Sequence, residues 1–333
     1  MATALPRSWM RRGLLASALF PVSLLFRFLV AIRRTLYQAG ALKSVRLSVP
    51  VIIVGNIFVG GTGKTPFTIW LVDQMRRAGY VPGVVSRGYG ARNRQPVEVT
   101  AVSTPADVGD EPVLIAHHAG CPVMVGRDRV AAAQTMLAAH PEVNLIISDD
   151  GLQHYALERD VEIIISDDRG HGNGWMLPAG PLREPASRPR DFTIVNTVRQ
   201  PAHGAGWFPM QIAGDTAERL SNRSQSIALN AIRSQRIVAA AGIGNPSRFF
   251  AMLRSAGLTI EELPLPDHYD FADNPFARVS ADIILITEKD AVKCTQIDTI
   301  KNDPRLWVVP VTARLDRALA ERIVEKCRGR PTA

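Results

Sequence analysis

A run of glycines followed by lysine and threonine is the part of this sequence with the clearest chemical meaning. Residues 55–66 read Gly-Asn-Ile-Phe-Val-Gly-Gly-Thr-Gly-Lys-Thr-Pro. Glycines in such a loop let backbone N–H groups point at phosphate oxygens, the lysine reaches the β- and γ-phosphates of a nucleoside triphosphate, and the hydroxyl after it ligates Mg²⁺. We therefore predict that the chain binds a nucleoside triphosphate through Gly60, Gly61, Thr62, Gly63, Lys64, Thr65 and Pro66.

Position 58 departs from the usual phosphate-loop pattern, because it holds Phe58 where a glycine is expected. The alternative interpretation is a glycine-rich turn with a coincidental Lys-Thr pair. The flanking residues favour a phosphate loop. Residues 49–54 are a short β-branched run typical of a buried parallel strand, and residues 67–78 carry apolar side chains at helical spacing.

Two neighbouring carboxylates follow a second apolar run. Residues 145–148 read Leu-Ile-Ile-Ser, and Asp149 and Asp150 come next. Taken alone, an Asp-Asp-Gly sequence fits a simple turn as well as a metal site. Beside a phosphate loop, a strand that ends in a carboxylate supplies an oxygen ligand for Mg²⁺. We predict a magnesium site formed by Thr65, Asp149 and Asp150.

Strand and helix patterns alternate along the chain, which predicts an α/β fold: a P-loop NTPase-type parallel-sheet domain followed by a second, smaller α/β domain. Residues 1–35 form an N-terminal membrane-associated helix, and residues 36–200 the nucleotide- and substrate-binding domain. Residues 201–236 are polar with poor periodicity and are predicted to be a linker, and residues 237–333 form the C-terminal domain. The predicted strands are 49–54, 82–86, 122–125, 143–148, 161–166, 192–198, 237–241 and 282–286, and the predicted helices are 67–78, 110–119, 127–140, 247–256 and 317–327.

The N-terminal segment and the net charge indicate a membrane surface. Arginines flank an apolar run over residues 14–32, which Pro21 and Arg27 interrupt, and the 333-residue chain carries a net charge of +8. A helix in the inner leaflet with arginines on anionic headgroups fits this pattern. A signal peptide cleaved near the small residues 39–41 is the alternative. No nucleic-acid module and no signal for an obligate protein partner is recognisable, and the three widely spaced cysteines fit a reducing cytosol.

Several further polar clusters, read together with the phosphate loop, carry a family resemblance. They are residues 55–56, 60–66, 86–90, 109–112, 149–154, 180–184, 267–271 and 287–290. In this order they resemble tetraacyldisaccharide 4'-kinase, the lipid A 4'-kinase of Gram-negative bacteria. The resemblance runs from the N-terminal helix to about residue 292. It implies ATP- and Mg²⁺-dependent phosphorylation of the 4'-hydroxyl of a tetraacyldisaccharide 1-phosphate, giving lipid IVA, at the cytoplasmic face of the inner membrane.

The resemblance also implies roles for individual residues. Asp110 would accept the proton of the sugar hydroxyl, assisted by His268 from the second domain, and Lys64 would stabilise the transferred phosphoryl group. Substrate contacts are implied for Arg87, Tyr89, Glu111, Gln153, His154, Arg183 and Glu184. Two simpler interpretations stay open from the residues themselves: His268 packs its own loop, and residues 287–290 cap a helix rather than read a nucleotide base.

The main alternative function is a membrane-attached P-loop NTPase that acts as a switch or assembly factor. Such a protein would need no lipid-sugar acceptor and would hydrolyse nucleotide slowly by itself. A basic P-loop protein acting on nucleic acid is a further alternative, and it would bind DNA or RNA with a strong salt dependence.

Overall fold

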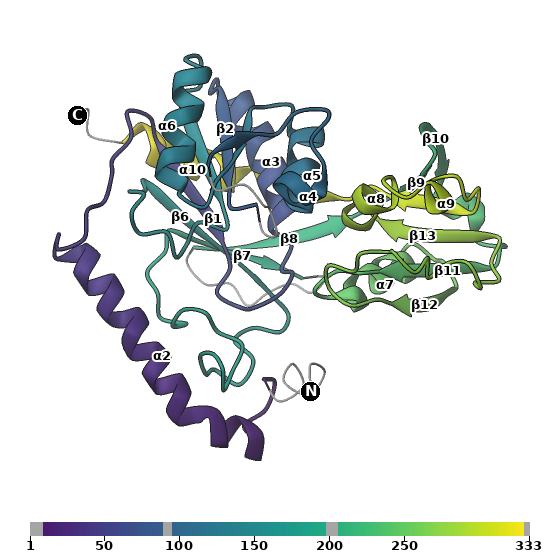
Figure 1. Cartoon of the computed structure of the whole chain (residues 1–333), viewed down its shortest axis with the longest axis horizontal. Helices are drawn as coiled ribbons and strands as arrows, with labels where there is room; N and C mark the ends of the chain where they lie inside the picture. The colour runs from purple at the N-terminus through teal and green to yellow at the C-terminus, as the bar shows by residue number, and fades with distance from the viewer. Residues whose placement is uncertain (1–8, 89–94, 198–205, 330–333) are drawn as a thin grey trace.

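Two β-sheets covered by helices organise the protein, for which the computed structural model describes residues 9–88, 95–197 and 206–329 (Figure 1). The first sheet and its helices are called the first unit here, and the second sheet and its helices the second unit. Both sheets have parallel cores, and an apolar helix precedes the first unit. The predicted α/β class with a second α/β unit is therefore confirmed.

The first sheet has nine strands in the order β15-β8-β7-β6-β1-β5-β2-β4-β3. Its strands are β1 Val51–Gly55, β2 Pro82–Ser86, β3 Val97–Glu98, β4 Val123–Val125, β5 Leu145–Asp149, β6 Val161–Asp167, β7 Phe192–Asn196, β8 Trp207–Ala213 and β15 Thr312–Leu315. The fully buried β1 lies between β5 and β6 and is parallel to both. Because the carboxyl ends of parallel strands share one edge, the loop after β1 and Asp149 at the end of β5 emerge together.

Helices cover both faces of the first sheet (Figure 1). The helices of this unit are α3 Lys64–Arg77, α4 Pro105–Val108, α5 Asp110–Ala119, α6 Arg129–Ala139 and α10 Arg317–Arg328. Successive side chains of β1 point to opposite faces, as a strand requires. Ile52 and Val54 join the core formed by α3, α5 and α10, whereas Val51 and Ile53 join the core beneath α6.

The second sheet has six strands in the order β10-β9-β14-β13-β11-β12. Its strands are β9 Thr216–Arg219, β10 Asn222–Ala228, β11 Ile237–Ala241, β12 Ile260–Pro264, β13 Ile283–Thr287 and β14 Leu306–Val309. Its helices are the 3₁₀ turn η1 Leu229–Ile232, α7 Pro246–Ser255, α8 Glu288–Cys294 and α9 Asp298–Lys301. Two apolar clusters, one on each face, hold this unit together.

The predicted linker at 201–236 is wrong for the part of it that the structure describes, because that part forms β8, β9 and β10. These strands pair antiparallel with a neighbour and expose many of their side chains to solvent. Strands β9 and β10 are mostly polar, and β8 is apolar but contains Pro209 and exposes part of its side chains, so none of the three has the clear pattern that reveals a buried strand. The predicted second domain also ends too late, since β15 and α10 return to the first unit.

Two short connections join the units side by side. Gly214 links β8 to β9, and Pro310 with Val311 links β14 to β15. A Cβ atom on Gly214 would lie 2.6 Å from the Pro310 carbonyl oxygen, so only glycine fits there. These two neighbouring connections attach the second unit to the first.

Helix α2, Leu14–Gln38, lies along one side of the first unit (Figure 1). It is the single helix among the described residues that is long and apolar enough to cross a membrane. Phe26 and Val30 pack against the core beneath α6, and the Ser23 hydroxyl donates to the Met176 carbonyl at 2.7 Å. Its other side exposes apolar residues, among them Leu14, Val22, Leu25, Phe28 and Leu29.

Candidate active site

The phosphate loop connects β1 to α3, as the sequence predicts. Helix α3 begins at Lys64, directly after Gly63, whose φ of 95° favours glycine. A Cβ atom on Gly63 would also lie 2.6 Å from the Asn196 amide nitrogen. The Asn56 amide nitrogen donates to the carbonyls of Phe58, at 2.6 Å, and Gly60, at 2.9 Å, which fixes the shape of the loop.

Phe58 has a structural reason to replace the usual glycine. It pairs with Leu182 in an isolated antiparallel bridge, an extended conformation that any residue adopts. Its buried ring lies under the Arg169 guanidinium, whose central carbon is 4.3 Å from the ring centroid. Arg169 also donates to the Gly61 carbonyl at 2.9 Å. The aromatic ring therefore supports the loop from the side.

Asp149 is a fully buried carboxylate beside this loop. Its Oδ1 lies 3.5 Å from the Thr68 hydroxyl, whereas its buried Oδ2 has no hydrogen-bond partner among the described residues. Burial, with the negative charge of Glu111 nearby, raises the pKa of Asp149 to about 7. A buried carboxylate oxygen without a hydrogen-bond partner fits a bound metal ion, which would favour the ionised form of Asp149.

Asp150 has a different environment from its neighbour. Its oxygens accept from the Arg183 guanidinium at 2.9 and 3.1 Å, and the Lys64 Nζ lies 3.8 Å away. Although burial opposes it, the positive charges of Lys64 and Arg183 hold the pKa of Asp150 well below its usual range. Asp150 thus ties the 180–184 segment to the phosphate-loop lysine, which also donates to Asn56 Oδ1 at 3.2 Å.

The described residues contain no group of three or more histidines, cysteines or carboxylates placed to hold a metal ion. Mg²⁺ in kinase sites is bound by one or two protein carboxylates together with substrate phosphates and water. Of the predicted ligands, Asp149 has the unpartnered oxygen and Thr65 is in the first turn of α3, while Asp150 is engaged by Arg183.

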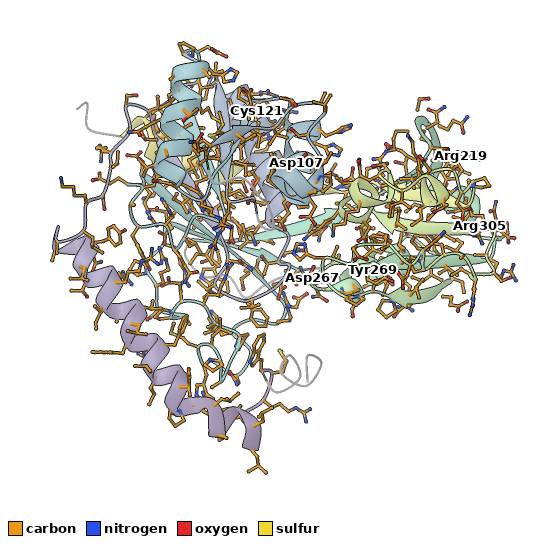
Figure 2. All side chains as sticks on the ribbon, in the orientation of Figure 1. Asp107, Cys121, Arg219, Asp267, Tyr269 and Arg305 are labelled. Atoms are coloured by element: carbon orange, nitrogen blue, oxygen red, sulfur yellow. The ribbon has the colours of Figure 1, made fainter. Side chains whose placement is uncertain are left out.

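Asp110 contacts one histidine and two lysines of the second unit. It is a buried residue at the start of α5, and its Oδ2 lies 3.1 Å from His268 Nδ1, 3.4 Å from Lys293 Nζ and 3.8 Å from Lys289 Nζ. Burial opposes ionisation, but the hydrogen bond from His268 and the two lysines outweigh it and hold the pKa of Asp110 well below its usual range. Figure 2 shows Asp267, the residue before His268, at the border between the two units.

Glu111 belongs to the same cluster. Its carboxylate accepts from Lys289 at 3.2 Å, and its charge contributes to the raised pKa of Asp149. The structure therefore gathers the phosphate loop, Asp149, Asp110, Glu111 and His268 in one region, although they come from both units.

The remaining predicted residues differ in how they lie relative to the site. Arg183 contacts Asp150, and Gln153 donates to the Arg183 carbonyl at 3.3 Å, so both border the site. Arg87 is exposed at the end of β2, and Tyr89 lies outside the described residues. His154 is partly buried, and this burial together with the nearby Arg129 lowers its pKa to about 4, which keeps the ring neutral at pH 7.

Glu184 lies in a separate buried cluster rather than on the surface of the site. It is 1% exposed, accepts from the Tyr155 hydroxyl at 2.8 Å, and lies 3.2 Å from the Arg188 guanidinium. With these partners its carboxylate braces the segment that carries Arg183. Its sequence position next to Arg183 contains no signal of this, because Tyr155 is distant in the chain and Arg188 lies four positions away in a segment without regular secondary structure.

The second unit contributes Lys293, which the sequence patterns did not single out, and gives Lys289 of the 287–290 cluster a contact that they did not predict. Thr287 accepts from the Asp290 amide at 3.2 Å, so residues 287–290 do cap helix α8. Lys289 and Lys293 of the same helix reach Asp110, and their spacing of one helical turn places them on one face. That spacing was the available signal. A Cβ atom on Gly244 would lie 2.4 Å from the Gly61 amide, so the turn before α7 touches the phosphate loop directly.

Comparisons with known proteins agree with this geometry. A sequence profile of the family described as tetraacyldisaccharide-1-P 4'-kinase matches residues 15–328. The chain is similar to proteins named tetraacyldisaccharide 4'-kinase from Janthinobacterium sp. (strain Marseille), with 62% identity over 99% of this chain and 97% of the relative, and from Herminiimonas arsenicoxydans, with 60% identity over 98% and 96%. The fold is similar to a crystal structure of LpxK from Aquifex aeolicus in complex with ATP, with a TM-score of 0.77, 28% identity, and coverage of 94% of this chain and 99% of that chain.

Proposed function

The chain belongs to the tetraacyldisaccharide-1-P 4'-kinase family, and we propose that it transfers the γ-phosphate of ATP to the 4'-hydroxyl of a tetraacyldisaccharide 1-phosphate. The observation that carries this proposal is the position of Asp110. A buried carboxylate held by His268 lies in the same region as the phosphate loop and Asp149. A nucleotide switch needs no such second carboxylate, whereas a kinase needs a group that receives the proton of the acceptor.

In the proposed reaction, Lys64 and the backbone N–H groups of residues 60–65 bind the β- and γ-phosphates of ATP. Thr65 and Asp149 would hold Mg²⁺, which when bound neutralises charge on the transferred phosphoryl group. Lys64 donates to Asn56 Oδ1 at 3.2 Å, and its ammonium group has further N–H donors for the phosphates. Asp150, which Arg183 holds, lies 3.8 Å from the Lys64 ammonium and helps to position it.

Asp110 is proposed to orient the sugar hydroxyl and to receive its proton. Its low pKa makes it a weak base at rest, yet the proton moves late in a loose phosphoryl-transfer transition state, so position matters more than basicity. His268 orients the carboxylate through the 3.1 Å hydrogen bond. Lys289 and Lys293 keep Asp110 ionised, which the role requires.

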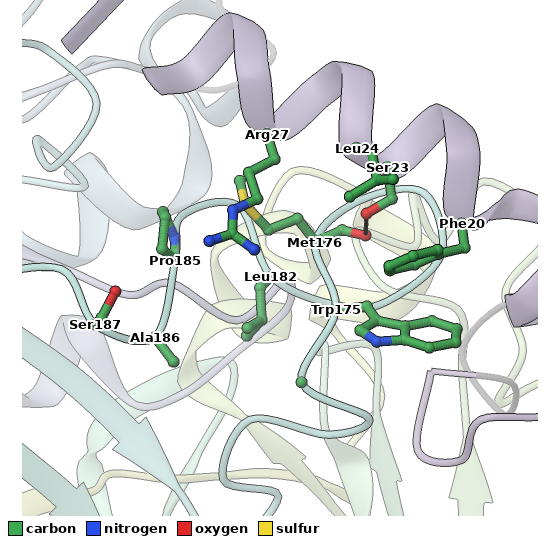
Figure 3. A pocket seen from close by; sticks show the side chains of 11 residues that line it. Phe20, Ser23, Leu24, Arg27, Trp175, Met176, Leu182, Pro185, Ala186 and Ser187 are labelled. Atoms are coloured by element: carbon green, nitrogen blue, oxygen red, sulfur yellow. Dashed lines mark hydrogen bonds between the residues drawn. The ribbon is translucent and has the colours of Figure 1, made fainter. Parts of the chain in front are cut away.

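The acceptor is a lipid, so the site must be reached from a membrane surface. We propose that the exposed apolar side of α2 lies in the inner leaflet of the inner membrane. A cavity of about 240 Å³ between α2 and residues 174–187 supports this arrangement (Figure 3). Phe20 and Leu24 line it with Trp175, and Arg27 points into it between Pro185 and Met176. Its apolar part suits an acyl chain. The packing of α2 onto the first unit favours a retained helix over a cleaved signal peptide.

Mass spectrometry of the lipid product tests the proposal. The protein is incubated with ATP, Mg²⁺ and tetraacyldisaccharide 1-phosphate in neutral detergent, and we expect the acceptor to gain one phosphate at the 4'-position. Asp110→Asn keeps the shape of the side chain and should abolish the gain. ATP hydrolysis at the same slow rate with and without the acceptor, with no phosphorylated lipid, would instead support the NTPase switch.

A further inference from the structure

A second cavity, of about 470 Å³, lies beside the C-terminal end of α2 and outside the cluster around Asp110. We call it the basic pocket. Helix α2 contributes Arg34 and Tyr37, residues 155–162 contribute Tyr155 and Arg159, and residues 188–191 contribute Arg188 and Arg190. The proposed reaction uses none of these six residues.

The three carboxylates in the lining already have cations of their own. Glu158 lies 3.6 Å from Arg46, and Asp191 lies 2.7 Å from Lys326, both of which are outside the lining. Glu162 is shared by two lining arginines, Arg159 at 3.0 Å and Arg188 at 2.7 Å. The lining therefore keeps an excess of positive charge after every carboxylate is paired.

Two guanidinium groups carry this excess. Arg190 donates to the carbonyls of Ala186 and Arg188, and to the Thr193 hydroxyl, all of them neutral oxygens. Arg34 is half-buried, and the described part of the chain gives it no hydrogen bond or ion pair. A guanidinium at a cavity wall without an anion is a favourable place for a phosphate, because its planar fork matches two phosphate oxygens.

The location identifies the kind of phosphate. Arg34 is near the C-terminal end of α2 at the same level as Ile32 and Leu36, whose 39% and 40% exposed side chains point to the opposite side of the helix, because residues two positions apart do not share a face. The half-buried Arg34 therefore faces the first unit at the level where the exposed apolar side of α2 ends. Tyr37 stands beside it, and tyrosines are typical of the headgroup level of a bilayer. We propose that the basic pocket binds the phosphate group of a membrane lipid, an inference that rests on the membrane placement of α2 proposed above.

This phosphate has two possible sources. One is the headgroup of an anionic phospholipid in the surrounding leaflet, and the other is the 1-phosphate of the acceptor itself. The chain between Arg183, which contacts Asp150, and Arg190 connects the basic pocket to the active site. Both sources present the same chemistry to Arg34 and Arg190, so an experiment with separate arms must distinguish them.

Two adjacent arginines of α2 provide a matched pair for the test. Arg34 lines the pocket, whereas Arg33 is exposed and does not. Full-length wild type, Arg34→Gln and Arg33→Gln are compared in binding to phosphatidylcholine vesicles with and without phosphatidylglycerol. In a second arm, KM is measured in neutral detergent for the acceptor with and without its 1-phosphate. Arg190→Gln serves as a second pocket variant, with its unfolding temperature recorded.

If a bilayer lipid fills the pocket, Arg34→Gln should lose about tenfold more affinity than Arg33→Gln on anionic vesicles alone. If the acceptor fills it, Arg34→Gln should raise KM about tenfold for the 1-phosphorylated acceptor alone. Equal behaviour of Arg34→Gln and Arg33→Gln in both arms would overturn the proposal. The vesicle arm needs no catalysis, and if the protein phosphorylates no acceptor the second arm measures the Kd of each acceptor in place of KM, so both arms decide without turnover. Wild type that binds neither vesicle would contradict the membrane placement itself.

Discussion

Asp110 and His268 are 158 positions apart in the sequence, yet Asp110 Oδ2 lies 3.1 Å from His268 Nδ1. Asp110 begins a helix of the first unit, and His268 lies in a loop of the second unit with a φ of 59°. The left-handed backbone is unusual for histidine and is held by the surrounding structure. The contact joins the units at the proposed proton acceptor.

If the two residues act as one unit, their losses should not multiply. We expect Asp110→Ala and His268→Ala each to lower kcat strongly, and the double variant to be little worse than the poorer single variant. Neither belongs to the phosphate loop, so ATP affinity should barely change. Steady-state kinetics of the four proteins, with unfolding temperatures as the control, measure this. Losses that simply multiply would separate the two roles.

Lys64 is proposed to be the cation that the loop directs at the transferred phosphate. We expect Lys64→Ala to lower kcat at least about 100-fold, roughly 3 kcal/mol of transition-state stabilisation, with the fold intact. Arg46→Ala removes an exposed cation of the same unit, paired with Glu158, and should leave kcat near normal. Near-normal turnover in Lys64→Ala would remove the loop lysine from the mechanism.

Lys289 and Lys293 are expected to keep Asp110 ionised. Replacing both by Met removes the cations that lower the pKa of Asp110 and leaves burial, which raises it. The pKa of Asp110 should therefore rise, and the acid side of the kcat profile should move to higher pH. A ¹³C-carboxyl NMR titration reports the pKa directly. The charge-conserving Lys293→Arg is the control and should leave the titration close to that of wild type.

His118 of α5 and Glu288 of α8 form a second contact between the units, with Nε2 2.7 Å from Oε1. The hydrogen bond to Glu288 raises the pKa of His118 despite the opposing effect of burial. A raised pKa means that this stabilisation is complete below the usual histidine pKa of about 6.5 and is lost as pH rises through the folded-state pKa.

His118→Gln should accordingly lower the unfolding temperature most at pH 5.5 to 6.5, by about 2 °C, and progressively less at higher pH. Thermal unfolding of wild type and variant across this range measures the difference. The same substitution in a Glu288→Gln background is the control and should show no such trend. A difference that is constant with pH would contradict the assignment of this ion pair.

The exposed apolar side of α2 is predicted to bind the membrane without help from the packed side. Leu25 and Phe28 are 58% and 60% exposed, so changing both to Glu should leave the fold intact and release the protein from vesicles. Val102→Glu changes an apolar residue that is 87% exposed on the first unit and should leave binding unchanged. Vesicle sedimentation measures the membrane binding of both variants. Retained binding of the α2 variant would locate the attachment elsewhere.

The phosphate loop and the carboxylate beside it are features that the sequence alone is enough to predict. Glycines at 60, 61 and 63 before Lys64, an apolar strand before them and a strand-end Asp149 contain enough information to predict the phosphate loop and its neighbouring carboxylate. The structure agrees because the signals involved, backbone freedom of glycine and periodic burial, act over a few residues. The order of the polar clusters along the chain is also specific enough to indicate the family.

Only the tertiary structure decided which of the predicted residues meet. Glu184 stands next to Arg183 in the sequence, yet its carboxylate is buried against Arg188 and Tyr155 while Arg183 faces Asp150. Lys289 and Lys293 reach Asp110 only because α8 packs against α5 across the two units. Strands β8 to β10 could not be predicted because few of their side chains are fully buried, so their residue types follow no clear strand pattern. Such contacts depend on how distant segments pack together, and no local pattern of residue types records that packing.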